Sequence, residues 1–222
     1  MPLTWHRRPL VGVDLATIGS DPETARMTAA AVVRYGGGRD TEVRSWAVTV
    51  HDRAPAAAVL EELLDALAAR VEAGWPLVIC DAPLVLTVLE REAARYGLVP
   101  LSVRAEGLCV LDALVLDKEV DKFRRGSRTL ESLCQHWRVK LADGAETPDR
   151  AKAVCAIVWK LANRHRRLTR PGLPELHRRQ TRWAVEQQNE RREYLAAIPG
   201  REHLADVRHG WPFYAMVPAA KL

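Results

Sequence analysis

The chain has 222 residues, 48% of them apolar and 27% charged, and a formal net charge of +5. This length and composition predict a globular protein that buries a full hydrophobic core without disulfides or structural metals. No run of about 20 apolar residues occurs, and the N-terminal residues are too polar for a signal peptide, so we expect no membrane span and a cytoplasmic location. The 4 cysteines are far apart in sequence and predict free thiols.

The first half of the chain predicts strands followed by a helix and another strand. A short strand is expected over 10–14, and strands over 26–35 and 41–50 flank the glycines at 36–38, which indicate a hairpin. A helix is expected over 55–73, where apolar residues recur with helical spacing until Gly74. The wholly apolar stretch 75–80 is typical of a buried parallel strand.

The second half predicts mainly helices. They are expected over 82–96, 129–137 and 149–165, with a short strand over 108–111 and a long helix ending near 197. This order predicts an α/β fold, a mixed sheet with helices on both faces and a C-terminal helical extension. We divide the chain into a domain over 1–168 and a helical and aromatic tail over 169–222. The site is expected at the carboxyl ends of the central strands, where Asp14 and Asp81 fall.

The segment 11–19, VGVDLATIG, resembles the first motif of the DnaQ-like (DEDDh) 3′→5′ exonucleases. Segment 76–86 resembles the second motif of that family, and segments 110–114 and 124–134 resemble the strand and helix that follow. The resemblance covers most of the chain and implies an RNase H-like fold. In the family the first strand ends in Asp-x-Glu, and both acids hold catalytic metal ions. Here Asp14 keeps the first position, but Ala16 stands at the second.

The other catalytic positions that the resemblance implies also carry different residues. The second motif normally reads Asn-Ala-x-Phe-Asp, which places Asp81 at the Asn and Val85 at the catalytic Asp. In the third motif, the His falls on Glu146 and the Asp on Ala151. The nearest acid, Asp149, lies two residues earlier, on a different face of the expected helix.

These differences bear directly on the chemistry. Two-metal hydrolysis needs carboxylates that hold two cations about 4 Å apart, and Mg²⁺ requires oxygen ligands in near-octahedral geometry. A single Asp cannot supply them, and the His that would act as general base is also missing. We therefore expect no bound metal, no cofactor and no exonuclease activity. The alternative is a rearranged site, built on Asp14, Asp81, Glu146 and Asp149, that processes or binds nucleic acid.

Positive charge is concentrated in segment 164–182, where seven arginines and one glutamate give a net charge of +6. The rest of the chain is close to neutral. A solvated helix face, an acidic partner protein and nucleic acid are the three interpretations, with nucleic acid the least favoured. A second group, Arg124, Arg125 and Arg128, follows several acids and is interpreted as locally paired surface charge.

The C-terminal region is similar to the helical tail of a subset of bacterial DnaQ-like proteins, on the residues 174–180 (PELHRRQ) and Trp183. The aromatic segment that follows should dock somewhere, either on its own domain, in a partner chain or over the ancestral groove. Aromatic and arginine residues are enriched at interface hot spots. The candidate interface residues are Arg178, Arg179, Arg182, Trp183, Trp211, Phe213 and Tyr214.

Together these features favour an exonuclease-fold pseudoenzyme that works with another protein chain, in a homo- or hetero-oligomer. The excess of arginine over lysine and the abundant alanine are typical of a GC-rich bacterial genome. We therefore expect a partner subunit or repurposed component of a biosynthetic complex. The first setting to test is a specialised-metabolite pathway, such as one that makes an aziridine-containing antibiotic.

Overall fold

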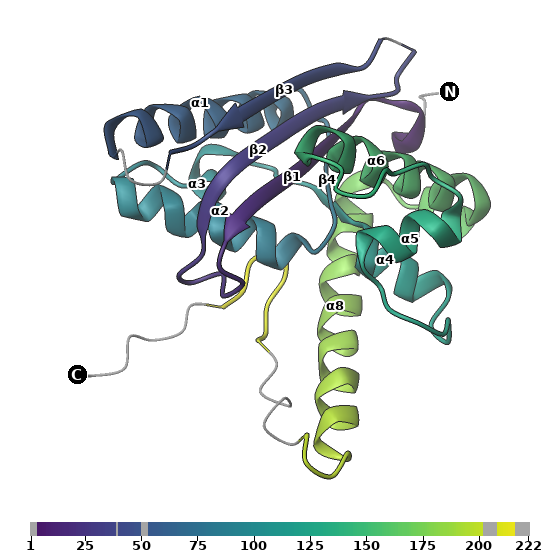
Figure 1. Cartoon of the computed structure of the whole chain (residues 1–222). Helices are drawn as coiled ribbons and strands as arrows, with labels where there is room; N and C mark the ends of the chain where they lie inside the picture. Colours follow the sequence, from purple (N-terminus) through teal and green to yellow (C-terminus); the bar gives the residue numbers. More distant parts are fainter. Residues whose placement is uncertain (1–3, 39, 50–52, 202–207, 216–222) are drawn as a thin grey trace.

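The computed structural model describes residues 4–38, 40–49, 53–201 and 208–215. A mixed sheet forms the centre of the molecule, and helices lie on both of its faces (Figure 1). The elements in chain order are η1 (Trp5–Arg7), β1 (Leu10–Ile18), β2 (Arg26–Tyr35), β3 (Glu42–Ala47), α1 (Arg53–Glu72), β4 (Leu77–Ile79), α2 (Ala82–Tyr96), α3 (Leu101–Arg104), β5 (Val110–Asp112), α4 (Ala113–Val120), α5 (Leu130–Trp137), α6 (Thr147–Arg164), α7 (Arg166–Thr169) and α8 (Leu173–Ala196).

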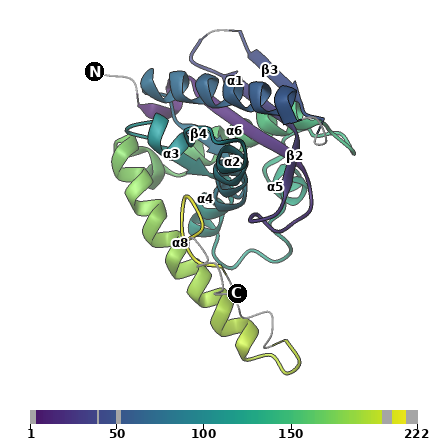
Figure 2. The same ribbon diagram turned by 90° about the vertical axis from the view of Figure 1, so that its left-hand side faces the viewer.

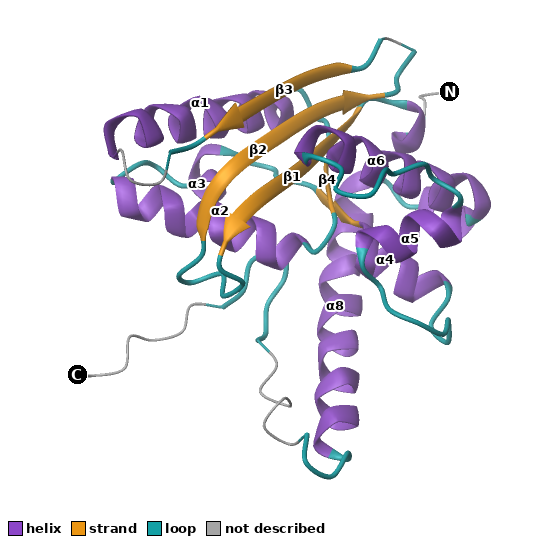
Figure 3. Ribbon diagram, viewed as in Figure 1, coloured by secondary structure: helices purple, strands orange, loops and turns teal. Residues whose placement is uncertain are grey.

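The five strands lie in the order β3-β2-β1-β4-β5 (Figure 3). Strand β1 pairs antiparallel with β2, and β2 pairs antiparallel with β3. Strand β4 is parallel to both β1 and β5. The predicted α/β fold with a mixed sheet is therefore confirmed, and β1 is the central strand.

Strand β1 is longer than predicted, because it continues past residue 14 to Ile18. Pairing with β2 along this whole stretch supports the extension, although its last two residues are exposed. Apolar patterning alone does not reveal such a paired ribbon. Strand β3 ends at Ala47, and residue 50, where the sequence predicted its end, lies outside the described residues.

The helices form two layers. Helices α1, α2 and α3 cover one face, where Leu60, Leu63, Leu64 and Leu67 of α1 are fully buried as the predicted stripe requires. Helices α5 and α6 cover the other face. Among the described helices, none combines the length and apolarity needed to span a bilayer.

Helix α6 lies unusually close to β1, and Gly12 makes this approach feasible. A Cβ atom at Gly12 would lie 2.1 Å from the carbonyl oxygen of Ala151 and 2.8 Å from Sγ of Cys155. Neither distance is compatible with a side chain. The glycine therefore sets the depth of α6 over the sheet, and with it the position of every α6 side chain near Asp14.

The first half of α8 completes the edge of the sheet. The backbone N–H of Val110 donates to Nδ1 of His177 (3.0 Å). The side-chain amide of Gln180 accepts from the N–H of Asp112 (2.8 Å) and donates to the carbonyl of Val110 (2.9 Å). Side chains of α8 thus form hydrogen bonds with backbone N–H and C=O groups on the free edge of β5, which no neighbouring strand pairs.

Beyond Ala184, its last buried residue, α8 projects away from the body of the molecule (Figure 2). The predicted tail therefore joins the sheet through the first half of α8, whereas the second half contacts α4 and residues 208–215 through polar side chains such as Gln187 and Gln188. The division at residue 168 stays a prediction, and residues 202–207 and 216–222 of the tail lie outside the described residues.

One charge cluster differs from its prediction. Asp117 on α4 is fully buried rather than on the surface, and its carboxylate pairs with Arg124 (3.1 Å) and Arg128 (3.1 Å). The indole of Trp137 also donates to it (2.8 Å). The prediction of local pairing was right for Arg124 and Arg128, and Arg125 is exposed as predicted. The paired acid is not on the surface, because α5 brings an aromatic ring over it.

Candidate functional site at the strand ends

Three acids lie where the central strands end. Strand β4 pairs with β1 only at Val11 and Gly12, so Asp14 lies just beyond the end of β4. Asp81 follows β4 after one residue, and Asp112 is the last residue of β5. The carboxyl edge of the sheet thus holds Asp14 and Asp81, as predicted, together with Asp112, which the sequence analysis did not single out.

Asp14 is tied to an arginine. Oδ2 of Asp14 lies 3.3 Å from Nε of Arg150 on α6, and the same guanidinium reaches Oε1 of Glu131 at 2.6 Å. Asp14 is only 8% exposed. Burial raises the pKa of Asp14 to about 6, although the charge and hydrogen bond of Arg150 counteract part of the effect.

Sequence reasoning missed Arg150 because the resemblance pointed one residue further along α6. Ala151 is fully buried beneath β1 and β2, where its carbonyl lies against Gly12. The α6 side chain that reaches Asp14 comes instead from position 150. An arginine one residue before an expected metal ligand is a signal that could have identified it.

The residues at the ancestral positions do not fit a two-metal centre. Ala16 offers only a methyl group, and Val85 is buried in the hydrophobic core. Glu146 is exposed at the start of α6. Within the described residues, no group of three or more His, Cys, Asp or Glu side chains is placed to hold a metal ion. The guanidinium of Arg150 already uses an oxygen of Asp14 that a metal would need.

The four acids of the alternative, rearranged site do not all lie in one place. Asp14 and Asp81 are near enough to Cys80 that both carboxylates raise the pKa of its thiol, after burial as the largest cause. Asp149, however, lines a separate concavity with Tyr35 and Lys140. Within the part of the chain that the structure describes, no three of these acids are grouped so that they could hold a metal ion.

Asp81 adopts a left-handed backbone conformation, with φ 64° and ψ 67°. Asp and Asn tolerate this region better than other residues with a side chain. From this position Oδ1 of Asp81 accepts a long hydrogen bond (3.4 Å) from the N–H of Leu84 and caps α2. Burial raises the pKa of Asp81.

Asp112 is a buried junction between elements. Its carboxylate accepts from the N–H of Ala82 at the start of α2 (2.9 Å) and from that of Leu114 at the start of α4 (2.9 Å). The indole Nε1 of Trp211 donates to it at 3.3 Å. Burial and the nearby Asp81 charge raise the pKa of Asp112 to about 6. Its oxygens are used within the protein, which indicates a structural role.

Residues 208–215, which we call the C-terminal strap, dock on their own chain. Trp211 is 7% exposed and its ring centre lies 4.9 Å from that of His177. The N–H of Tyr214 donates to Oγ1 of Thr87 (2.9 Å), and Arg208 pairs with Asp21 (2.6 Å). Of the three docking sites considered for the aromatic tail, the structure places Trp211 on its own domain.

The strap closes one side of a cavity of about 560 Å³ beside Asp81 and Asp112. The other walls come from the start of α2, from α4, from the loop before α5 and from α8. Hydrogen bonds in both directions between Gly210 and Gln188 hold the strap against α8 (3.0 and 3.3 Å). The cavity lies at the carboxyl ends of β4 and β5, where ligands bind in open α/β sheets.

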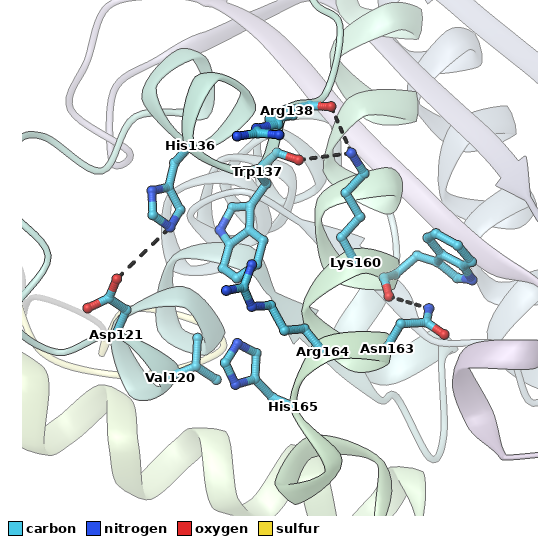
Figure 4. A pocket seen from close by; sticks show the side chains of 10 residues that line it. Val120, Asp121, His136, Trp137, Arg138, Lys160, Asn163, Arg164 and His165 are labelled. Atoms are coloured by element: carbon cyan, nitrogen blue, oxygen red, sulfur yellow. Dashed lines mark hydrogen bonds and ion pairs between the residues drawn. The ribbon is translucent and has the colours of Figure 1, made fainter.

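A second concavity of about 680 Å³ lies between the end of α5 and the second half of α6 (Figure 4). Lys160 on its wall donates to the carbonyls of Trp137 (2.9 Å) and Arg138 (2.7 Å), which caps α5. Arg164 lies 5.9 Å from the centre of the Trp137 ring. None of the three acids at the strand ends lines this concavity, so we place the candidate site at the sheet edge.

The predicted interface residues differ in exposure. Arg178 and Arg182 are exposed, while Arg179 and Trp183 are half-buried. Arg178 and Arg179 both pair with Glu175. Trp211 is buried, and Phe213 and Tyr214 are half-buried in the strap. The arginines therefore remain available to a partner, whereas Trp211 already packs within the chain.

No protein-family model matches the chain, and no curated protein matches it. Solved structures of exonucleases do match it. E. coli Exonuclease I in complex with a dT13 oligonucleotide aligns with a TM-score of 0.52 at 14% identity, over 72% of this chain and 42% of that chain. Exonuclease I from Methylocaldum szegediense aligns with a TM-score of 0.52 at 16% identity, over 86% of this chain and 46% of that chain. This chain thus spans less than half the length of these exonucleases, and its fold is exonuclease-like.

Proposed function

We propose that this protein is a catalytically inactive member of the exonuclease fold that works as a subunit of a protein complex. The observation that carries the proposal is the contact between Asp14 and Arg150 (3.3 Å). Asp14 is the acid that the resemblance would assign to metal binding, and an internal cation neutralises it instead. A metal ion would have to displace this guanidinium and would then find a methyl group at Ala16.

The projecting half of α8 supports the second part of the proposal. Val185 and Tyr194 on this half are 42% and 66% exposed. Exposed apolar and aromatic side chains on a helix that leaves the body are suited to a partner surface, and Arg178 and Arg182 lie on the same helix. A role in a bacterial biosynthetic complex, including an aziridine-forming antibiotic pathway, is the setting we propose to test first.

The proposed loss of exonuclease activity can be tested with the purified chain, single-stranded DNA and Mg²⁺ or Mn²⁺. We expect no degradation above background, and no rescue in Ala16→Glu, because Val85 and Ala151 still cannot bind a metal. Isothermal titration should detect no saturable metal binding. Metal-dependent degradation that disappears in Asp14→Ala would establish the alternative, a nuclease with a rearranged site.

The partner role can be tested separately on α8. Val185→Glu and Tyr194→Glu should abolish a complex recovered from the native host and identified by mass spectrometry, or a homo-oligomer measured by light scattering. Val103→Glu on α3 is a matched control, because Val103 is also strongly exposed but lies elsewhere. A chain that stays monomeric and recovers no partner would contradict the proposal, as would equal losses in all three variants.

A further inference from the structure

The cavity behind the C-terminal strap has the size and the mixed lining of a small-molecule site. Its volume of about 560 Å³ falls within the range of roughly 300–1,000 Å³ that is usual for ligand pockets. Apolar side chains form one part of the lining, namely those of Pro83, Leu114, Val115, Ala184 and Trp211. Neutral polar and charged side chains form the rest, and most of the charged ones already have partners.

The basic residues around the cavity differ in whether they form ion pairs within the chain. Arg208 pairs with Asp21, Arg128 with Asp117, and Lys118 with Glu190. Arg191 on the projecting half of α8 also lines the cavity, but within the described residues it is not paired with any acid. Its guanidinium is therefore a cation that is free to bind an anionic ligand.

Asp81 is the acid in the cavity lining that can still accept hydrogen bonds from a ligand. Its neighbour Asp112 accepts three hydrogen bonds, whereas Asp81 accepts a single long one from Leu84 among the described residues. Arg191 is near enough to favour the ionised form of Asp81, yet the two groups do not form an ion pair. The cavity thus contains a carboxylate that can accept further hydrogen bonds and a guanidinium without an ion pair among the described residues. The two groups are near each other but not in contact.

We propose that this cavity binds an α-amino acid with an apolar or aromatic side chain. The ammonium group of the ligand donates to Asp81, its carboxylate accepts a bidentate pair of hydrogen bonds from Arg191, and its side chain packs against Leu114, Val115 and Trp211. A zwitterion satisfies both groups at once, which a simple anion or a simple amine cannot do. The inference does not depend on the proposed loss of nuclease activity.

The strap is part of this site, because Trp211 and Tyr214 form one of its walls. Gly210 sets the turn of the strap at φ 118°, and a Cβ there would lie 2.4 Å from the carbonyl oxygen of Phe213. Gly210→Ala should therefore displace the wall and weaken ligand binding. This variant leaves both charged groups in place, so it tests the wall alone.

The test uses the full chain with three matched probes: L-phenylalanine, 3-phenylpropionate, which lacks the ammonium group, and phenethylamine, which lacks the carboxylate. L-phenylalanine should bind saturably by calorimetry and raise the melting temperature, since a ligand of the native state stabilises it. Each analogue should bind roughly tenfold or more weakly, because each loses one charge-assisted interaction.

Variants of residues in the cavity lining test whether L-phenylalanine binds there. Asp81→Asn and Arg191→Gln should each weaken L-phenylalanine binding by roughly tenfold or more. Arg192→Gln should leave it unchanged, because Arg192 is the adjacent arginine on the same helix and does not line the cavity. Arg191 lies on the projecting half of α8, so its variant should fold even if Asp81→Asn does not. The proposal is overturned if L-phenylalanine shows no binding at about 10 mM, or if Arg191→Gln and Arg192→Gln behave alike.

Discussion

Replacing Asp14 with Asn should stabilise the protein at neutral and alkaline pH. Burial raises the pKa of Asp14 from 3.8 to about 6 even though Arg150 contacts it. Each pKa unit corresponds to roughly 1.4 kcal/mol, so keeping this carboxylate ionised costs the folded state up to about 3 kcal/mol. The amide of Asn has nearly the same shape and carries no charge. Arg150 keeps its contact with Glu131 in the variant.

The dependence on pH follows from the sign of the shift. The folded-state pKa lies above the unfolded one, so between about pH 4 and pH 6 the folded state binds more protons than the unfolded state. The contribution of Asp14 to stability is therefore lost as the pH rises through this window. The difference between the wild type and Asp14→Asn should be small near pH 4 and should reach its maximum of about 3 kcal/mol above pH 7.

Urea denaturation of both proteins at pH 4, 6 and 8 measures this difference, and the effects of other titrating groups cancel between them. The control is Asp143→Asn, because Asp143 is exposed and should give the same stability as the wild type at each pH. The reasoning fails if Asp14→Asn is less stable than the wild type at pH 8. It also fails if the difference does not change with pH, since the ion pair with Arg150 would then fully offset the cost of burial.

Three further results are expected. Asp117→Asn should destabilise the protein by roughly 3–5 kcal/mol in urea denaturation, because it leaves two arginines without their buried partner. Gly12→Ala should prevent native packing of α6, measured as lost cooperativity in thermal unfolding, because the new Cβ would overlap Ala151; Gly172→Ala, at an open position, is the control. Binding of L-phenylalanine should weaken as the pH falls through the raised pKa of Asp81, because only the ionised carboxylate holds the ammonium group, and a titration across acidic pH checks this.

Two acids of the candidate site could be predicted from the sequence, but the contacts that their side chains make could not. Asp14 and Asp81 were located because strand ends can be read from apolar patterning and turn residues. Arg150 was missed because the position of a helical side chain depends on how deep the helix lies over the sheet, which the contact at Gly12 decides. Asp112 was not singled out because its role depends on three hydrogen-bond donors. Ala82 and Trp211 lie far from it in the sequence, and Leu114 belongs to α4, a helix that the sequence did not predict.

The sequence by itself determined the chain order of the five strands and of helices α1, α2, α5, α6 and α8, although not the shorter helices α3, α4 and α7. It also determined the long apolar stripe of α1 and the absence of acids at Ala16 and Val85. These features depend on local periodicity and residue type, which are present before the chain folds. The tertiary structure alone decided that Arg150 neutralises Asp14 and that Trp211 packs against Asp112. Both contacts join residues roughly a hundred or more positions apart, and contacts of that kind exist only once helix packing has brought the segments together.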